Sequence, residues 1–272
     1  MSTFMKENPP KISVITVTYN RLSDLHKTFH NVLSQSYFNV EYIIIDGSSK
    51  DGTLDFLHKN SDKISFWVSE PDNGIYDAMN KGASLASGDW IIYMNSGDTF
   101  FSENTLSEVV SYLNDQADIV YGGVEAIIED KYQRRVLRQE PLALSELWRN
   151  MPTCHQSIFV RRELQVQFPF DTSFIWCADH DFIVKLYLKR FRFQVIPVVI
   201  SKFDATGGHR DILIHTKERW RISKNLAGYI KRNTYFVREY CGFLFWKHIA
   251  TRVRDVMPNE WILTLRKYRG TY

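Results

Sequence analysis

The sequence predicts an α/β fold: a mixed, mainly parallel sheet flanked by helices, followed by a helical extension toward the C-terminus. From residue 11 to residue 98, short β-branched or apolar segments alternate with segments in which apolar residues recur at helical spacing. Strands and helices that alternate in this way form parallel sheets through right-handed crossovers. After residue 212 the chain becomes basic and aromatic at helical spacing, which indicates the extension.

The first half of the chain alternates regularly between expected strands and expected helices. The segment 12–18 is β-branched and is bounded by Pro9, Pro10 and Asn20, so it predicts a strand. Further strands are expected at 40–45, 64–68 and 90–94. Helices are expected at 22–33, 51–59 and 74–86, where apolar side chains lie three or four positions apart.

The second half is less regular. Between residues 118 and 138 the pattern becomes hairpin-like, with Gly122 and Gly123 separating two short β-branched segments, 119–121 and 124–128. A helix is expected over 179–189 and a strand over 193–200. The pair Gly207 and Gly208 predicts a hinge before the basic extension.

The formal net charge of +3 hides an uneven distribution of charge. Residues 216–272 hold 13 Lys+Arg, 4 Asp+Glu and 11 aromatic residues, whereas residues 1–215 hold 21 Lys+Arg and 27 Asp+Glu. The chain has 3 Cys without close spacing, so neither a disulfide framework nor a zinc site is expected. Neither a secretory signal nor an apolar segment long enough to span a membrane is apparent, and a cytosolic location is expected.

Acidic loops follow several of the expected strands. Asp46 and Asp98 each come directly after a buried strand, and ligands of parallel sheets bind beyond the carboxyl ends of the strands. A carboxylate such as Asp98 on a tight loop suits a divalent cation that bridges phosphates, and Asp179 suits a general base. Each loop also has a simpler interpretation: a helix cap at Ser49 or Asp51, an Asx turn at Asp98, and an N-cap at Asp179.

Together these loops resemble the inverting glycosyltransferases of family 2, which have the Rossmann-like GT-A fold. The resemblance spans residues 11–210, and it points to bacterial transferases that build O-antigen, capsule or colanic-acid-type polysaccharides. The segments that carry it are V-I-T-V-T-Y-N, I-I-D-G-S-S-K-D-G-T, P-D-N-G-I-Y-D-A-M-N-K-G, G-D-W-I-I-Y-M-N-S-G-D and A-D-H-D-F.

The resemblance implies a role for each matching residue. Binding of the nucleotide sugar is implied for Thr18, Tyr19, Asn20, Asp46, Asp72, Asn80, Lys81, Asn95 and Ser96, with Asp46 accepting a hydrogen bond from the uracil ring. Asp179 matches the general base. His155 and Trp176 lie on the acceptor side, although a core histidine and a buried structural tryptophan are the simpler alternatives.

The metal motif departs from the family pattern. The family has acidic residues at the first, third and fourth places, whereas here Asn95 and Gly97 replace the first two, and only Asp98 is ionisable. Mg²⁺ and Mn²⁺ can be held by one or two carboxylates together with phosphate oxygens. His209 is the candidate for a second ligand, with a surface histidine as the alternative.

The implied activity is transfer of a hexose from a UDP-sugar to a saccharide acceptor, linked to a polyprenyl diphosphate, by direct displacement with Asp179 as base and Mn²⁺ or Mg²⁺ as cofactor. The implied organisation is a flexible N-terminus (1–10), a catalytic domain (11–212) and a helical tail (213–272). Within the catalytic domain, 11–98 would bind the nucleotide and 99–212 the acceptor.

The tail is expected to lie on an anionic membrane surface through residues 216–272, which would make the protein peripheral on the cytoplasmic face of the cell membrane. Packed helices with a solvated basic face, or a homodimer interface, are the alternatives. Three other functions remain as competitors. The first is a degenerate protein that binds a sugar nucleotide without turnover. The second is a nucleotidyltransferase, which is disfavoured because this chain has no Gly-rich phosphate loop after its first strand. The third is a nucleic-acid-binding protein, which only the charged tail supports.

Overall fold

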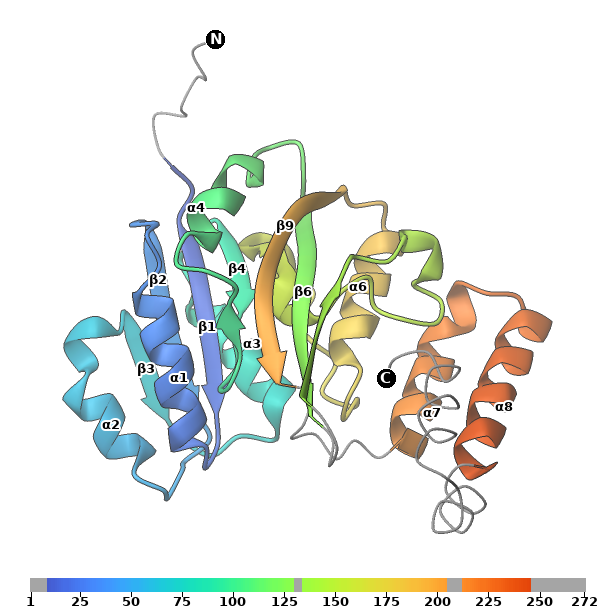
Figure 1. Ribbon diagram of the computed structural model, residues 1–272, viewed down its shortest axis with the longest axis horizontal. Helices are drawn as coiled ribbons and strands as arrows, with labels where there is room; N and C mark the ends of the chain where they lie inside the picture. The colour runs from blue at the N-terminus through green and yellow to red at the C-terminus, as the bar shows by residue number, and fades with distance from the viewer. Residues whose placement is uncertain (1–8, 130–133, 205–211, 246–272) are drawn as a thin grey trace.

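A computed structural model describes residues 9–129, 134–204 and 212–245, and its centre is one mixed sheet (Figure 1). The strand order is β3-β2-β1-β4-β8-β6-β9-β5, and β7 pairs with β6. Most of the predicted N-terminal segment 1–10, the predicted hinge at Gly207 and Gly208, His209 and the end of the tail (246–272) lie outside the described residues.

The strands are β1 (Ile12–Thr18), β2 (Val40–Asp46), β3 (Phe66–Ser69), β4 (Trp90–Tyr93), β5 (Thr99–Phe100), β6 (Ile119–Glu129), β7 (Arg134–Gln139), β8 (Ile158–Arg161) and β9 (Phe193–Asp204). The helices are α1 (Leu22–Leu33), α2 (Thr53–Lys59), α3 (Ile75–Leu85), α4 (Thr105–Val109), α5 (Arg162–Gln167), α6 (Ala178–Leu188), α7 (Ile212–Ile222) and α8 (Tyr229–Phe245). The α/β fold with a mixed sheet and a helical extension is confirmed.

Parallel pairing dominates the first half of the sheet. Strand β1 pairs in parallel with β2 and β4, and β2 pairs in parallel with β3. Strand β8 is antiparallel to both β4 and β6, whereas β9 is parallel to β6. The carboxyl ends of β1, β2, β3 and β4 therefore meet at one edge, toward the bottom of Figure 1.

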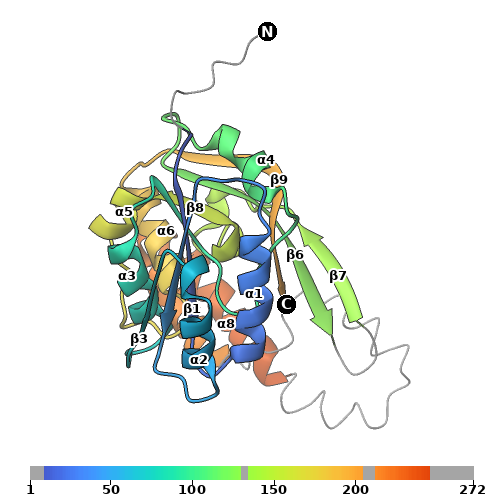
Figure 2. The ribbon, with the colours of Figure 1, turned by 90° about the vertical axis from the view of Figure 1, so that its left-hand side faces the viewer.

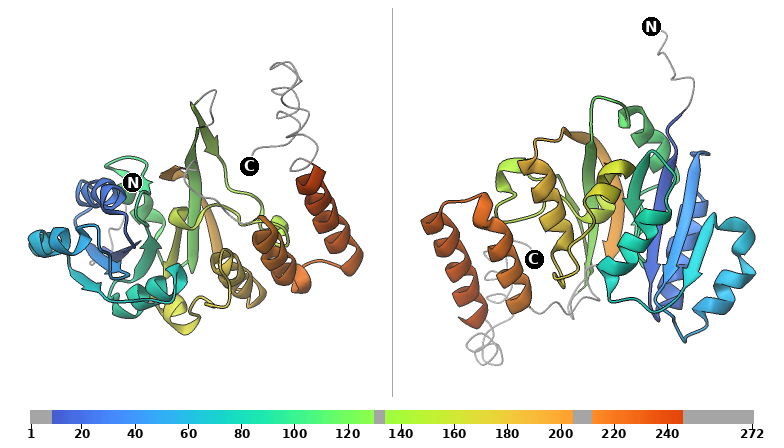
Figure 3. Two further views of the ribbon diagram at one scale, coloured as in Figure 1. Left: turned by 90° about the horizontal axis from the view of Figure 1, so that it is seen from below. Right: turned by 180° about the vertical axis from the view of Figure 1, so that it is seen from behind.

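Helices cover both faces of the sheet, and each face has its own hydrophobic core (Figures 2 and 3). Side chains alternate between the two faces along a strand. In β1, Ile15 and Val17 belong to the core that contains the apolar residues of α3, α5 and α6, while Ile12 and Val14 belong to the core that contains those of α1, α2 and α4. The uninterrupted apolar character of β1 is thus explained by burial on both faces.

The predicted break at Gly122 and Gly123 is wrong. The chain continues through both glycines as one long strand, β6, whose residues 124–129 pair with β7. A Cβ atom on Gly122 would lie 2.3 Å from the carbonyl oxygen of Val198 in β9, so only glycine fits there. The pairing of β6 with β9 shifts register around Gly123. These glycines permit close packing of two strands and do not form a turn.

The helical extension packs as a pair of helices beside α6 (Figure 3). Arg219 of α7 is 7% exposed, donates hydrogen bonds to the carbonyl oxygen of Arg149 and pairs with Glu239 of α8 at 3.0 Å. Part of the basic charge of the extension therefore serves internal packing. Among the described residues, no helix has both the length and the apolar composition needed to cross a membrane.

Candidate active site

The loops after β1, β2 and β4 converge at the carboxyl edge of the sheet, as expected for ligand-binding loops. The first of them contains Asn20 in a left-handed conformation (φ 51°), which is uncommon for a residue other than glycine. Its backbone N–H donates to Ser49 Oγ at 2.7 Å, and its side-chain oxygen accepts from the N–H of Lys50 at 2.8 Å. Asn20 thus joins the β1 loop to the β2 loop.

Asp46 ends β2 and is fully buried. Its carboxylate accepts hydrogen bonds from the N–H of Ser49 (3.0 Å), from Ser49 Oγ (2.5 Å) and from Ser69 Oγ (2.6 Å). Helix α2 begins after Gly52, and the N–H of its first residue, Thr53, donates to Asp51 Oδ1 at 3.2 Å, so Asp51 takes part in capping it, whereas the Ser49 hydroxyl donates to Asp46. In this structure Asp46 organises the loop that follows it and the end of β3.

Tyr19 and Asp72 lie on either side of Gly47. A Cβ atom at Gly47 would lie 2.6 Å from Asp72 Oδ2 and 3.2 Å from Tyr19 Cδ2. Tyr19 is 62% exposed, so its ring is open to a stacking partner. Thr18, at the end of β1, is buried, and its hydroxyl has no hydrogen-bond partner within the part of the chain that is described.

Asn80 and Lys81 of α3 make contacts within the protein. Both amide atoms of Asn80 bond the backbone of Phe170, at 2.9 and 2.8 Å. The Phe170 ring packs between Tyr76 of α3 and Phe182 of α6. Lys81 donates to the carbonyl oxygen of Pro71 at 3.0 Å, next to Asp72, and pairs with Glu70 at 3.0 Å. Asn80 therefore links α3 to the segment between α5 and α6, and Lys81 fixes the turn before α3.

The loop 95–98 follows β4 and is held by its backbone. The N–H of Met94 donates to the carbonyl oxygen of Ile15 (2.8 Å), and that of Ser96 donates to the carbonyl oxygen of Val17 (3.2 Å). The loop thereby stays beside β1. Asp98 receives a hydrogen bond from the Gln156 side chain at 3.4 Å. Burial raises the pKa of Asp98 to about 6, although His155, Lys27 and Arg21 act in the opposite direction.

His155 lies between this loop and Asp179. Its Nε2 is 3.1 Å from the amide nitrogen of Asn95, and its Nδ1 is 3.5 Å from Asp179 Oδ2. Its side chain is 26% exposed, so it is not the fully buried core histidine of the simpler alternative. The structure thus connects the predicted metal loop to the predicted base through a histidine.

Asp179 lies in the first turn of α6, and Cys177 occupies the N-cap position. Its Oδ1 accepts from the N–H of His180 (2.8 Å) and from the hydroxyl of Tyr76 (3.3 Å). Burial would raise the pKa of Asp179, but the hydrogen bond and charge of His155 and the N–H of His180 outweigh it and hold the pKa below its usual range. The carboxylate is therefore ionised at neutral pH and held on two sides.

Several oxygen atoms around the 95–98 loop have no hydrogen-bond partner among the described residues. They are Asn95 Oδ1, Ser96 Oγ and Gln156 Oε1. Buried polar atoms in proteins are normally paired, and oxygen atoms are the ligands that Mg²⁺ and Mn²⁺ prefer. Over the same described ranges, no group of three or more His, Cys, Asp or Glu side chains could hold a metal ion. One carboxylate with neutral oxygens fits a cation that takes its other ligands from phosphate.

Trp176 is 37% exposed, so it is not the buried structural tryptophan of the alternative interpretation. The N–H groups of Ile175, Trp176 and Cys177 all donate to the carboxylate of Glu218 in α7. The sequence pointed to Gln156 only together with His155, as part of a segment on the acceptor side, and it did not single out Tyr76 or Glu218. Tyr76 lies inside a quoted motif, whereas Glu218 is one acidic residue in a basic tail and carries no sequence signal.

Comparisons with known proteins agree with this geometry. The family model described as Glycosyl transferase family 2 matches residues 13–182. An uncharacterized glycosyltransferase of Mycobacterium tuberculosis is 31% identical over 210 residues, covering 74% of this chain and 79% of the relative. A PGL/p-HBAD biosynthesis glycosyltransferase of Mycobacterium bovis is 26% identical over 218 residues, covering 75% and 81%.

Solved structures show the same fold. S. aureus TarS 1-349 in complex with UDP superimposes with a TM-score of 0.62 at 17% identity, covering 92% of this chain and 76% of that one. The mannosyltransferase PcManGT of Pyrobaculum calidifontis, in complex with GDP-Man and Mn²⁺, gives 0.61 at 17% identity, covering 85% and 70%. The fold is therefore GT-A, and the chain belongs to glycosyl transferase family 2.

Proposed function

We propose that this glycosyltransferase moves a hexose from a UDP-sugar to a saccharide acceptor with inversion, and that Asp179 is the general base. The observation that carries the proposal is the orientation of Asp179 by the Tyr76 hydroxyl and the His180 N–H. His155 lies between Asp179 and the 95–98 loop. General bases need a fixed direction and the correct protonation state, and Asp179 has both.

The chemistry follows from this arrangement. The acceptor hydroxyl attacks the anomeric carbon, the bond from that carbon to the diphosphate breaks, and UDP leaves on the opposite face. The hydroxyl proton passes to Asp179. Because its pKa is low, Asp179 is ionised and able to accept a proton at neutral pH, although it is a weak base. His155, at 3.5 Å from Asp179, is placed to orient and stabilise the carboxylate before this transfer. Single displacement inverts the anomeric configuration.

The donor is assigned to the first half of the chain, 11–98. Tyr19 offers an exposed ring to the base, beside Asp72 and Gly47. The buried Asp46 supports this pocket by ordering Ser49 and Ser69, and a direct bond to uracil would require one of those partners to give way. TarS, which shares the fold, was solved with UDP and with UDP-GlcNAc.

A divalent cation, Mn²⁺ or Mg²⁺, fits the oxygen atoms of Asn95, Ser96 and Asp98. When bound, it would supply positive charge that offsets the charge developing on the diphosphate. Burial disfavours the ionised form of Asp98, and a bound cation would stabilise that form. His209, the predicted second ligand, lies outside the described residues and remains a prediction.

The acceptor is assigned to the second half, 99–212, where the exposed ring of Trp176 lies three residues before Asp179. Aromatic rings commonly pack against the apolar faces of sugars, which suits a saccharide acceptor. A polyprenyl-diphosphate-linked acceptor of surface polysaccharide synthesis follows from the sequence resemblance. The relative from Mycobacterium bovis is named for PGL/p-HBAD biosynthesis.

Attachment to an anionic membrane is proposed through α8. Ile230 is 80% exposed and Val237, seven residues later on the same face, is 60% exposed. Tyr229 and Tyr240 are also exposed, as is Arg238. An apolar stripe with aromatic and basic neighbours is typical of helices that lie in the membrane interface. Arg219 and Arg232 are buried, so their charges are not available to a lipid surface. The exposed face of α8 with Ile230 and Val237 is therefore the proposed contact.

Calorimetric titration with UDP, with and without Mn²⁺, tests the main proposal. We expect UDP to bind more tightly with Mn²⁺, and Asp98→Ala to remove that enhancement. Glu103→Ala, an exposed acidic residue beyond β5, is the matched control and should behave as wild type. Absence of UDP binding under both conditions would overturn the proposal. Binding without transfer to any acceptor from a panel of UDP-sugars would favour the degenerate binding protein.

Flotation with vesicles of phosphatidylcholine and phosphatidylglycerol tests the membrane contact. The full chain should float, and Ile230→Asp combined with Val237→Asp should stay in solution. Val166→Asp is the control, because Val166 is 48% exposed on α5, far along the chain from the extension. Equal flotation of the double variant and the wild type would reject α8 as the membrane contact and leave packed helices or a dimer interface.

A further inference from the structure

We propose that Glu218 of α7 is a positioning residue, which holds in place the segment that carries the base and the acceptor-side tryptophan. This inference rests on the proposed role of Asp179. Glu218 Oε1 accepts from the N–H of Ile175 at 2.7 Å. Its Oε2 accepts from the N–H groups of Trp176 at 3.0 Å and Cys177 at 3.1 Å.

Three consecutive backbone N–H groups converge on one carboxylate, and Glu218 is only 8% exposed. Burying a charged group is costly unless hydrogen bonds replace its water, and these three charge-assisted bonds do so. Such convergent N–H groups form an anion-binding concavity in the backbone. Here the anion is a side chain from a helix more than forty positions further along the chain.

The contact replaces a missing local cap. Helix α6 has Cys177 at its N-cap, and no side chain of that position caps it. Glu218 binds the Cys177 N–H from outside the helix, and Asp179 follows two residues later. A shift of Glu218 therefore moves the first turn of α6, and with it the distance between Asp179 and His155.

A second contact from α7 acts on the other side of α6. Arg219 donates to the carbonyl oxygen of Arg149, and the neighbouring Leu147 carbonyl accepts from His180 Nε2 at 2.6 Å. Two adjacent residues of α7 thus hold the two segments, 175–177 and 147–149, that enclose the start of α6. The predicted boundary at residue 212 separates α7 from a site that it helps to build.

The test compares Glu218→Gln with wild type on the full chain. An amide offers one acceptor oxygen and an NH₂ group that opposes a backbone N–H, so the three bonds cannot all form. We expect kcat to fall by about 10-fold to 100-fold, since small displacements of a catalytic group have effects of that order. The acceptor KM should rise, the acid limb of the kcat profile should move to higher pH, and the Kd for UDP should change less than twofold.

Hydrogen exchange separates this inference from the proposed function. In Glu218→Gln, the peptide covering 174–181 should exchange faster, while the peptide covering 95–98 should be unchanged. If wild type bound UDP but transferred no sugar, the proposed function would fail, and the exchange pattern would still decide whether Glu218 holds the segment. Glu239→Gln, which alters the same extension through Arg219, is the control and should leave exchange of 174–177 unchanged.

Two outcomes would overturn the inference. One is unchanged exchange over 174–181 in Glu218→Gln. The other is a uniform loss, in which UDP binding and kcat fall together and Glu218→Asp behaves in the same way, because that would make Glu218 a general stability element.

Discussion

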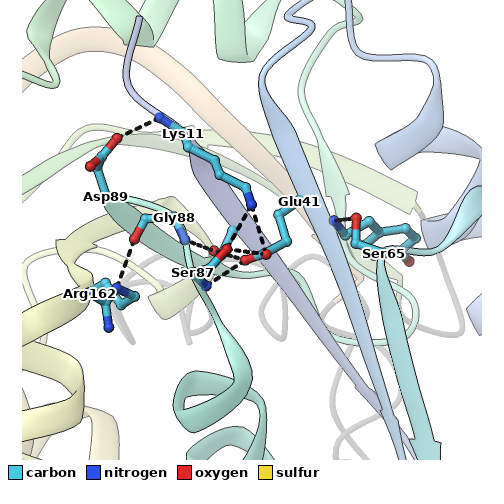
Figure 4. Close-up of polar contacts among 9 residues, drawn as sticks. Lys11, Glu41, Ser65, Ser87, Gly88, Asp89 and Arg162 are labelled. Carbon is cyan, nitrogen blue, oxygen red and sulfur yellow. Dashed lines mark hydrogen bonds and ion pairs between the residues drawn. The ribbon is translucent and has the colours of Figure 1, made fainter. Parts of the chain in front are cut away.

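Two carboxylates at opposite ends of the parallel strands, Glu41 and Asp98, differ in their hydrogen bonding and in the direction of their pKa shifts. At the amino end, Glu41 accepts hydrogen bonds from Ser13 (2.6 Å), from both donor groups of Ser87 (2.8 and 2.6 Å) and from Lys11 (3.0 Å) (Figure 4). Burial alone would raise the pKa of Glu41, but these bonds outweigh it and lower the pKa to about 2. At the carboxyl end, burial raises the pKa of Asp98 to about 6.

This contrast separates groups that stabilise the fold from groups that await a ligand. The amino-end cluster is saturated: Gly88 also donates to Ser13 Oγ, and Lys11 donates its N–H to Asp89 (Figure 4). The 95–98 loop instead leaves buried oxygen atoms without partners among the described residues. Unsatisfied polar groups reduce stability, so the three unpaired oxygen atoms around this loop fit a site that a ligand completes.

The largest effect is expected from Asp179→Asn. An amide cannot take the proton of the acceptor hydroxyl, so kcat should fall by about 10²-fold to 10⁴-fold with UDP binding retained. Asp181→Asn lies two residues further on, in the same first turn but on another face of α6, and is paired with Lys185; it is the matched control and should stay within a few-fold of wild type. Transfer assays with a labelled UDP-sugar measure both. Full activity in Asp179→Asn would show that another group is the base.

Glu41→Gln should change stability and not chemistry. Because the folded pKa of Glu41 lies below its unfolded value of 4.5, its contribution is present above that pH and is lost as pH falls through about 2. The shift corresponds to about 2–3 kcal/mol of unfolding free energy at pH 7, with the side chain 12% exposed. Urea unfolding at pH 7 and pH 3 measures it. A loss that is as large at pH 3 as at pH 7 would contradict the assignment.

Asp46→Asn tests whether a carboxylate's contribution to stability depends on its position in the sheet or on its hydrogen bonds. Asp46 lies at the carboxyl end, yet its three bonds resemble those of Glu41. We expect a loss of about 1–3 kcal/mol, because the amide cannot accept all three hydrogen bonds. Asp55→Asn, on the exposed side of α2, serves as the reference. A neutral result in thermal unfolding would show that saturation does not predict stability here.

Asp98→Asn should change stability with the opposite sign. A pKa raised from 3.8 to about 6 means that the stabilising contribution is complete below pH 4 and is lost as pH rises through 6. The variant should therefore be about 2–3 kcal/mol more stable than wild type at pH 8 in metal-free buffer, with little gain at pH 4. Chemical unfolding at the two pH values measures this. A destabilised variant at pH 8 would remove the contrast between the two ends.

Local patterns predicted most of the fold. The strand 12–18 and the helix 22–33 match β1 and α1, because β-branched content and helical spacing are properties of neighbouring residues. Gly122 was misread, since the close approach of β9 that excludes a side chain there is a contact between distant segments. Asp98 and Asp179 were identified by motif, but nothing local revealed that His155 lies between them.

The role of Glu218 could not be predicted from local sequence patterns. Its partners are backbone N–H groups, which every residue except proline has, so the sequence at 175–177 gives no hint of an acceptor in α7. The helical character of the extension could be predicted, whereas its contact with residues 175–177, just before Asp179, required the structure.

The backbone attachment of the 95–98 loop has a consequence for redesign. The N–H groups of Met94 and Ser96 prolong the hydrogen-bond ladder of β1 past the end of β4, so the course of the loop is set by atoms common to all residues. Side chains at 95 and 96 can then be exchanged without relocating the loop. Asn95→Asp would thereby place a carboxylate, on an unchanged backbone, at the position that the family resemblance gives to the first acidic residue of the metal motif.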